Sequence, residues 1–311
     1  MQKGISVPRE MSIIEFFEKF GNNEQCRNDL WKKRLKIGFE CPKCEGNIGY
    51  ELESKYLWQC KNCGHQVSLI AGTAFDNTKI GLQKWYLAAF FIISSKTGIS
   101  AKELQHQIKV TYKTAWYVNR RLRDAMRLAN DKYKLDGIVT MDEAYFTGRD
   151  TTKETIIKRG RGTNKSKVIV AVSLTEDGKP MYARMQVVDN FKAKTIEKFA
   201  ENYIEKGSKI VTDGFRSYKS QKIQKDYFVD YDMVSADSED SKLKWLHTVI
   251  SNVKAFILGT FHGLKADDLQ CYLDEFCYRF NRRYMPHLMF DKLINSAITT
   301  PPMGYYRSDV S

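Results

Sequence analysis

The sequence predicts a multidomain protein with a small zinc ribbon, a helical helix-turn-helix module and an α/β domain that contains a mixed sheet. Three observations predict this fold class. Two Cys-x-x-Cys pairs lie near the start of the chain, amphipathic helical patterns follow, and strand-like segments rich in Val, Ile, Tyr and Thr begin after Asn130. At 311 residues the chain is long enough for about two or three domains.

The charge of the chain favours a polyanionic partner. Lys and Arg number 50 against 37 Asp and Glu, which gives a net charge of +13. The first residues lack the apolar core of a signal peptide, and no apolar run approaches the roughly 18 residues of a membrane span. We therefore expect a cytoplasmic, nucleoid-associated protein with double-stranded DNA as its partner and no membrane partner.

The cysteine pairs have the spacing of a structural zinc site. Fifteen residues separate Cys41 and Cys44 from Cys60 and Cys63. His65 lies beside the second pair, but four thiolates already complete a tetrahedral site. Few apolar residues lie between the pairs, so binding of Zn²⁺ must supply much of the folding free energy. We expect a zinc ribbon over residues 37–72.

Helical patterns lie on both sides of the ribbon. Residues 11–35 carry apolar side chains at helical intervals, and we assign residues 1–36 to a helical segment. Within residues 73–131, an apolar helix precedes two shorter helices whose N-terminal caps are Ser100 and Thr111. A helix, a short turn and a basic second helix form the helix-turn-helix arrangement, in which the second helix enters a DNA major groove.

The second of these helices carries basic and polar residues that we expect on its outer face. The residues expected to contact DNA are Lys113, Asn119, Arg120 and Arg123, and Arg121 and Arg127 are expected on the same face. The alternative is an ordinary helical bundle whose basic face is only solvated.

The remainder of the chain is predicted to be one α/β domain over residues 132–290, followed by a tail over residues 291–311. Its connection after the first strand, Thr147–Lys165, is rich in Gly, Thr, Lys and Arg and is predicted to be a basic loop. The expected strands are Asp136–Phe146, Lys167–Leu174, Pro180–Val188 and Ser208–Thr212, and the expected helices are Ala193–Ile204, Lys242–Leu258 and residues 265–283.

Two carboxylates at strand ends point to a divalent metal site. Asp142 and Asp213 each follow an apolar strand segment, and two carboxylates brought side by side repel one another unless a cation lies between them. On the helix Lys242–Leu258, His247 and Lys254 share one face, whereas Asn252 lies roughly 140° round the helix from His247. A single aspartate after a strand is more simply a turn residue, so the metal-site prediction depends on the two aspartates and the helix residues together.

The order of these motifs resembles bacterial insertion-sequence transposases of the DDE class, over about residues 25–285. The resemblance implies an RNase H-like fold in which two aspartates and a third residue on a helix hold two Mg²⁺ or Mn²⁺ ions, with a basic residue seven positions later. It rests on the zinc ribbon, the helix-turn-helix, Asp142-Glu143, Thr212-Asp213-Gly214, His247 to Lys254, Gly259-Thr260-Phe261-His262-Gly263 and Tyr278-Arg279-Phe280-Asn281-Arg282-Arg283.

Carried onto this sequence, the resemblance implies Asp142 as the first metal ligand, Asp213 as the second and His247 as the third. The step of 34 residues from Asp213 to His247 is similar to the family's interval, and Lys254 then stands at the seven-residue offset. The sequence departs from the family pattern because the usual third residue is glutamate. Asn252 and an acid from Asp237, Glu239 and Asp240 stay alternatives.

The function that the resemblance implies is transposition. The N-terminal modules would bind terminal inverted repeats, and the α/β domain would cut and rejoin DNA. Because two element ends must be held together, we expect a homodimer on DNA. The alternatives are a DNA-binding regulator or inactive copy, and an RNA-processing nuclease of the same fold.

Glu143 is expected on the opposite sheet face from Asp142, in a structural role.

Overall fold

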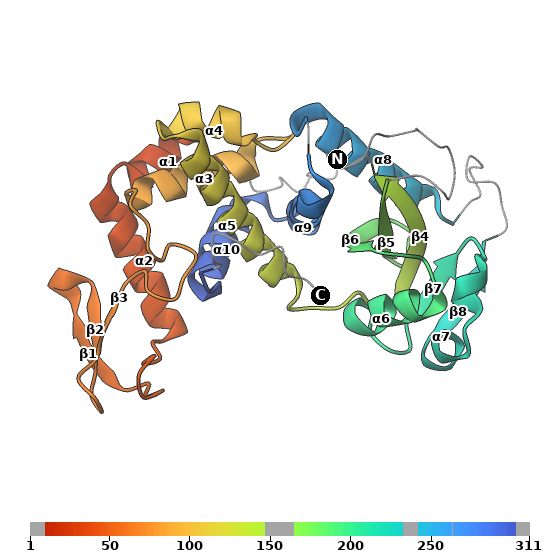
Figure 1. The fold of residues 1–311 in the computed structure, drawn as a ribbon, viewed down its shortest axis with the longest axis horizontal. Helices are drawn as coiled ribbons and strands as arrows, with labels where there is room; N and C mark the ends of the chain where they lie inside the picture. Colours follow the sequence, from red (N-terminus) through yellow and green to blue (C-terminus); the bar gives the residue numbers. More distant parts are fainter. Residues whose placement is uncertain (1–9, 147–164, 233–241, 263, 303–311) are drawn as a thin grey trace, which may run out of the picture. The chain divides into compact units, whose positions relative to one another are not determined.

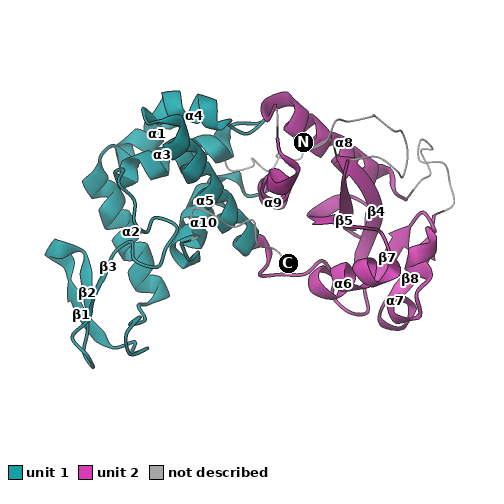
Figure 2. Cartoon of the chain, viewed as in Figure 1, with its two compact units in different colours: residues 1–129, 284–311 teal, residues 130–283 magenta. Residues whose placement is uncertain are grey.

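The protein is described from a computed structural model over residues 10–146, 165–232, 242–262 and 264–302 (Figure 1). The predicted basic loop Thr147–Lys165, except its last residue, and the alternative ligands Asp237, Glu239 and Asp240 lie outside these residues. The chain forms two compact units, one of residues 1–129 and 284–311 and one of residues 130–283 (Figure 2). Within the described residues, no helix combines the length and apolar character needed to cross a membrane.

The N-terminal helical segment is two helices rather than the single helix expected over residues 11–35. Helix α1 spans Ile13–Phe20 and α2 spans Asn23–Ile37. The break follows from Asn22, whose side chain accepts a hydrogen bond from the Gln25 backbone N–H, while the Gln25 side chain accepts one from the Asn22 backbone N–H. This reciprocal cap starts a second helix.

The cysteine segment folds as a three-stranded antiparallel ribbon. Its strands are β1 (Gly49–Leu52), β2 (Leu57–Cys60) and β3 (Gln66–Ser68), with the short 3-10 helix η1 (Glu53–Lys55) between the first two. Trp58 on β2 stacks on Phe39, with ring centroids 5.6 Å apart. The ribbon is attached to α2 because the Arg34 guanidinium donates to the carbonyls of Leu69 and Ala71 at 2.6 and 2.7 Å.

The helix-turn-helix prediction is confirmed as a fold. Helices α3 (Leu82–Ser94), α4 (Ala101–Ile108) and α5 (Tyr112–Asn130) follow one another. The Ser100 side chain accepts a hydrogen bond from the Glu103 backbone, and the Thr111 hydroxyl accepts one from Thr114. Lys109 ends α4 in the left-handed region at φ 50°, which turns the chain sharply into α5.

The C-terminal part differs from the predicted tail. Helix α10 spans Pro286–Thr299 and belongs to the first unit, together with α2 and α3. Its Phe290 ring packs against Phe16, Phe20 and Tyr86 at centroid distances of 6.0, 5.2 and 5.7 Å. Helix α10 therefore contributes an apolar stripe to the core of the first unit and is not a tail.

The second unit is the predicted α/β domain with a five-stranded mixed sheet in the order β6-β5-β4-β7-β8. Strands β4 to β6 form an antiparallel meander, and β7 and β8 are parallel to β4. This order is that of an RNase H-like domain, so the predicted fold class is confirmed. Its strands are β4 (Ile138–Phe146), β5 (Ser166–Leu174), β6 (Pro180–Val188), β7 (Lys209–Thr212) and β8 (Phe228–Tyr231).

Helices cover both faces of this sheet (Figure 1). Helices α8 (Lys244–Thr260) and α9 (Leu269–Phe280) pack against one face, in a core that includes Val170, Val249 and Leu273. The other face is covered by α6 (Ala193–Tyr203), α7 (Gln221–Asp226) and the 3-10 helix η2 (Arg216–Lys219). The sheet therefore carries two separate cores, one on each side.

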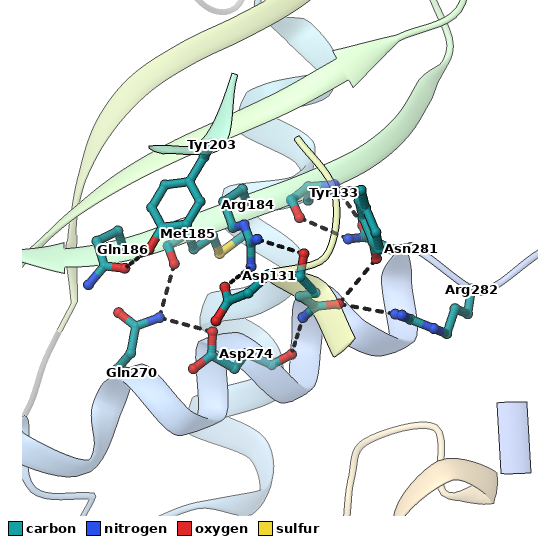
Figure 3. A network of polar contacts seen from close by, with 12 residues as sticks. Asp131, Tyr133, Arg184, Met185, Gln186, Tyr203, Gln270, Asp274, Asn281 and Arg282 are labelled. Carbon is teal, nitrogen blue, oxygen red and sulfur yellow. Dashed lines mark hydrogen bonds and ion pairs between the residues drawn. The ribbon is translucent and has the colours of Figure 1, made fainter. Parts of the chain in front are cut away.

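Polar side chains close the open edge of β6, as Figure 3 shows. The Asn281 amide accepts from the Ala183 backbone N–H at 2.7 Å and donates to the Ala183 carbonyl at 3.0 Å. Gln270 on α9 makes the same pair of bonds to Val187 N–H and Met185 C=O. These amides replace a neighbouring strand, so the edge is not available for pairing with another chain.

Candidate active site and metal centres

Asp142 and His247 meet on the face of the sheet that α8 covers. Alternation along β4 places Asp142, Ala144 and Phe146 on this face, where Ala144 and Phe146 pack against α8. The His247 Nε2 atom lies 3.3 Å from Asp142 Oδ2, although 105 residues separate the two in the sequence. The structure thus brings together one predicted aspartate and the predicted histidine.

Asp213 lies at the same level of the sheet as Asp142. Thr140 on β4 pairs with Val211 on β7, and each aspartate follows two residues later. The Asp213 Oδ1 atom accepts a hydrogen bond from the Phe215 backbone at 3.0 Å, which orients the carboxylate. The two parallel strands therefore bring both aspartates to the same level of the sheet. Asp213 follows the end of β7, as predicted, whereas Asp142 lies in the middle of β4, which continues to Phe146, and not at a strand end.

Burial and neighbouring charges shift the pKa of the Asp142 carboxyl. Burial is the largest cause that raises the pKa of the Asp142 carboxyl, and the negative charge of Asp213 raises it further. A backbone hydrogen bond from Glu143 at 2.7 Å and the proximity of His247 act in the opposite direction. A bound cation would relieve the same unfavourable charge, so the chemistry of this donor set fits a divalent metal.

Helix α8 is attached to the sheet next to this site. The Asp232 carboxylate, which follows β8, accepts a hydrogen bond from the Lys242 backbone N–H at 2.7 Å. Asp232 is itself held by a 2.8 Å bond from its N–H to the carbonyl of Thr212, the residue before Asp213. Sequence reasoning missed Asp232 because strand β8, only four residues long, was not recognised.

Lys254 and Asn252 occupy different surroundings on α8. The Lys254 ammonium lies 5.7 Å from the centre of the Phe146 ring, along the β4 face that carries Asp142. Asn252 is exposed on the helix surface. The geometry places His247 and Lys254 on the side of α8 that faces β4, and their roles in metal and DNA binding stay predictions.

The four cysteines of the ribbon form a preorganised metal centre. Their ligand atoms all lie within 4.8 Å of one another, with 3.5 Å between the sulfurs of Cys41 and Cys63 and of Cys44 and Cys60. Zn–S bonds of about 2.3 Å in a tetrahedron require sulfurs about 3.8 Å apart, so the cluster fits zinc. Within the described residues no other set of three or more His, Cys, Asp or Glu is gathered this tightly, the Asp142 site included.

Backbone groups favour the thiolate at one of these cysteines. Desolvation disfavours the charged form of Cys41, but hydrogen bonds from the backbone of Lys43 and Cys44 outweigh it and lower the pKa of the Cys41 thiol to about 7. Thiolates are the form in which cysteine binds zinc. In the same knuckle a backbone hydrogen bond with Gly46 lowers the pKa of the Cys44 thiol, but the neighbouring thiols and burial outweigh it and raise this pKa to about 12, so the two cysteines differ before an ion binds.

The exposed face of α5 differs from the one that the sequence predicts. Lys113 is exposed and Arg120 is half-buried, as expected for DNA contacts. Asn119, Arg121 and Arg123 are buried, and the Arg121 guanidinium donates to the carbonyls of Ala74 and Asp76 at 2.8 and 2.7 Å. Placing these three on the outer face is wrong, because the segment before α3 covers Arg121 and the connection after α3 covers Asn119, whose side chain donates to the Ile99 carbonyl at 3.4 Å.

Comparison with known proteins supports a single family. The family model described as the ISXO2-like transposase domain matches residues 134–281, and the transposase zinc-ribbon domain matches residues 21–66. An uncharacterised protein of the transposable element ISH50 from Halobacterium salinarum is 28% identical over 216 residues, which are 64% of this chain and 70% of that protein.

Solved structures of the Mos1 mariner transposase are distant neighbours. A pre-cleavage Mos1 transpososome is 12% identical, with 68% of this chain and 77% of that chain covered at a TM-score of 0.30. The Mos1 catalytic domain is 14% identical, with 61% and 95% covered at a TM-score of 0.29. The chain thus contains an ISXO2-like transposase domain over residues 134–281 and a transposase zinc-ribbon domain over residues 21–66, and both resemble parts of insertion-sequence transposases, as the sequence predicts.

Proposed function

We propose that the protein is the transposase of an insertion sequence, which binds the terminal inverted repeats of its element and catalyses metal-dependent DNA cleavage and strand transfer. The observation that carries the proposal is the contact between Asp142 and His247 at 3.3 Å, at the level of the sheet where Asp213 follows β7. The match to the transposase domain model supports the reaction class, and the net charge of +13 supports a nucleic-acid substrate.

Four residues would act at this site, in two roles. Asp142, Asp213 and His247 would hold Mg²⁺ or Mn²⁺, and Lys254 would contact a phosphate close to the scissile bond. When bound, two such ions stabilise the charge that develops on the attacking and leaving oxygens of a phosphodiester. Before binding, His247 holds the Asp142 carboxylate through their 3.3 Å contact, and Phe215 orients Asp213.

The histidine should alter the metal preference of the site. An imidazole in place of a carboxylate removes one negative charge and one hard oxygen ligand, so Mg²⁺ should bind more weakly and Mn²⁺, which accepts nitrogen more readily, should gain. Cleavage should be faster in Mn²⁺ than in Mg²⁺ at matched, limiting concentrations. Equal rates in the two metals would contradict this assignment.

DNA recognition is proposed for the zinc ribbon and the helix-turn-helix. Lys113, at the exposed N-terminal end of α5, would contact DNA directly, and Arg120 would do so from the half-buried flank of the same helix. Tyr112, which is 54% exposed beside Lys113, is a further candidate that charge alone does not identify. We propose a homodimer on DNA, because cutting and joining require two element ends in one complex.

The test is cleavage and binding of a labelled duplex that carries the terminal inverted repeat of the encoding element. Wild type should cut it in the presence of Mn²⁺, and Asp142→Ala and Asp213→Ala should bind with unchanged affinity but not cut. Binding without cutting by all three proteins would indicate a regulator or an inactive copy. Preferential cutting of an RNA–DNA hybrid would indicate an RNA-processing nuclease.

A further inference from the structure

A buried tyrosine hydroxyl lies behind the candidate site. Tyr218 belongs to η2, five residues after Asp213, and its side chain is fully buried. Among the described residues, no group stands in ordinary hydrogen-bond geometry with its hydroxyl oxygen, which is itself shielded from solvent. Buried hydroxyls are almost always hydrogen-bonded in folded proteins, so a hydroxyl kept at this position calls for a specific partner.

The charges around the hydroxyl identify that partner. Burial is the largest cause that raises the pKa of Tyr218, and Glu143 is the strongest charged influence, ahead of Asp142 and Asp213. Glu143 follows Asp142 on β4, so its side chain lies on the opposite sheet face. Tyr218 packs in the core on that face, with Met141 and Ile210. Tyr218 and Glu143 therefore lie on the same side of the sheet, opposite the face that carries Asp142.

Backbone hydrogen bonds connect both residues to the predicted metal ligands. The Glu143 N–H donates to Asp142 Oδ1 at 2.7 Å. After the end of β7, the Phe215 N–H donates to Asp213 Oδ1 at 3.0 Å, and the Tyr218 N–H donates to the Phe215 carbonyl at 3.0 Å. A hydrogen bond between the Tyr218 and Glu143 side chains would thus connect Asp142 to Asp213 through a continuous series of bonds.

We propose that the Tyr218 hydroxyl donates a hydrogen bond to the Glu143 carboxylate and that this pair is a positioning element, which fixes the separation of Asp142 and Asp213. Neither residue touches DNA or metal; each acts through the aspartate to which it is connected. The proposal rests on the proposed function for its effect on cleavage, but not for its effect on the local structure. It assigns Tyr218 as the specific partner of Glu143, for which the sequence predicts a structural role.

A matched pair of variants tests the proposal. Tyr218→Phe removes one oxygen and keeps the ring in the core. Tyr227→Phe is the control, because Tyr227 lies in the same core and its hydroxyl is also buried without a partner in the described residues. The carboxylates that influence Tyr227 are Asp226, Glu201 and Glu205, none of which belongs to the candidate site.

Two measurements are made on wild type and both variants. Hydrogen exchange reports the Phe215 and Tyr218 amides, and a Mn²⁺ titration of end cleavage gives the concentration for half-maximal rate. Losing a group that orients a metal ligand typically costs about 10- to 100-fold in metal affinity or activity. Tyr218→Phe should therefore exchange faster at both amides and need about tenfold more Mn²⁺, whereas Tyr227→Phe should match wild type.

Each outcome decides the proposal. Unchanged exchange and an unchanged Mn²⁺ requirement in Tyr218→Phe would overturn it, and so would equal effects in Tyr227→Phe, which would indicate a general loosening of the core. Adding Glu143→Gln to Tyr218→Phe should cause little further loss. If wild type does not cut in either metal, the proposed function fails, while the exchange comparison still decides whether the pair fixes the loop.

Discussion

Replacing Asp124 by asparagine should change how the stability of the protein depends on pH. Asp124 lies on α5 and is only 4% exposed. Burial raises the pKa of its carboxyl from 3.8 to about 6, against the opposing pull of Arg120 and Arg127. The folded protein therefore keeps a proton that the unfolded chain loses above about pH 4. This group's contribution to stability is full below pH 4 and is lost as the pH rises through 6.

The size of the effect follows from the two pKa values. A difference of about two units is worth about 3 kcal/mol at about 1.4 kcal/mol per unit, and about half of this falls between pH 5 and 7.5. Asparagine has the same shape and does not titrate. The free energy of unfolding of Asp124→Asn, relative to wild type, should therefore rise by about 1.5 kcal/mol from pH 5 to 7.5.

Urea unfolding at several pH values, with saturating zinc, measures this difference. The control is Asp291→Asn, because Asp291 is in the same unit and its side chain is 54% exposed beside Lys33. Because Asp124 is buried and Asp291 is not, the pH-dependent change should be larger for Asp124→Asn than for Asp291→Asn. A pH-independent difference for Asp124→Asn would refute the reasoning. It would mean that the neighbouring arginines, including Arg120 at 3.7 Å, offset the effect of burial on this carboxyl.

Three further changes have defined outcomes. Cys60→Ser should abolish the binding of one zinc per chain and unfold the ribbon, as measured by metal analysis and circular dichroism; full zinc content would contradict the four-cysteine site. Asn281→Ala should cost about 2–4 kcal/mol in urea unfolding, because it leaves the buried N–H and C=O of Ala183 without their partners; a loss below about 1 kcal/mol would show that the edge of β6 tolerates solvent. Lys113→Ala should reduce the salt dependence of end binding by about one phosphate contact, whereas Asn119→Ala should lower stability and leave that slope unchanged; equal slopes in all proteins would contradict the assigned DNA face.

Strong local patterns explain which elements the sequence predicts correctly. Strands β5 and β6 match the predicted strands to within one residue, because long apolar runs between turn residues have few other solutions. Strand β8 is only four residues long and has Phe228 72% exposed, so no alternation signals it. Helix α10 has an apolar stripe, but only the tertiary structure shows that this stripe packs against α2 and α3.

The candidate site was predictable where the periodicity of a strand or helix determines the side on which a residue lies. The alternation of β4 and the helical register of α8 place Asp142 and His247 on facing surfaces, and the structure brings them together. Burial on α5 was not predictable, since the sequence does not show that the segment around Ala74 packs on the side that carries Arg121. Tyr218 carried no sequence signal, because a tyrosine after a strand is ordinary until its charged neighbours are known.

His247 is proposed to complete a metal-dependent site with Asp142 and Asp213. Cleavage of a labelled terminal-repeat duplex in Mn²⁺ and in Mg²⁺ by wild type, His247→Ala and Asn252→Ala tests this proposal. We predict that His247→Ala binds the duplex but loses cleavage, while Asn252→Ala cuts like wild type. Retained cleavage in His247→Ala, or its loss in Asn252→Ala alone, would show that His247 is not the third metal ligand.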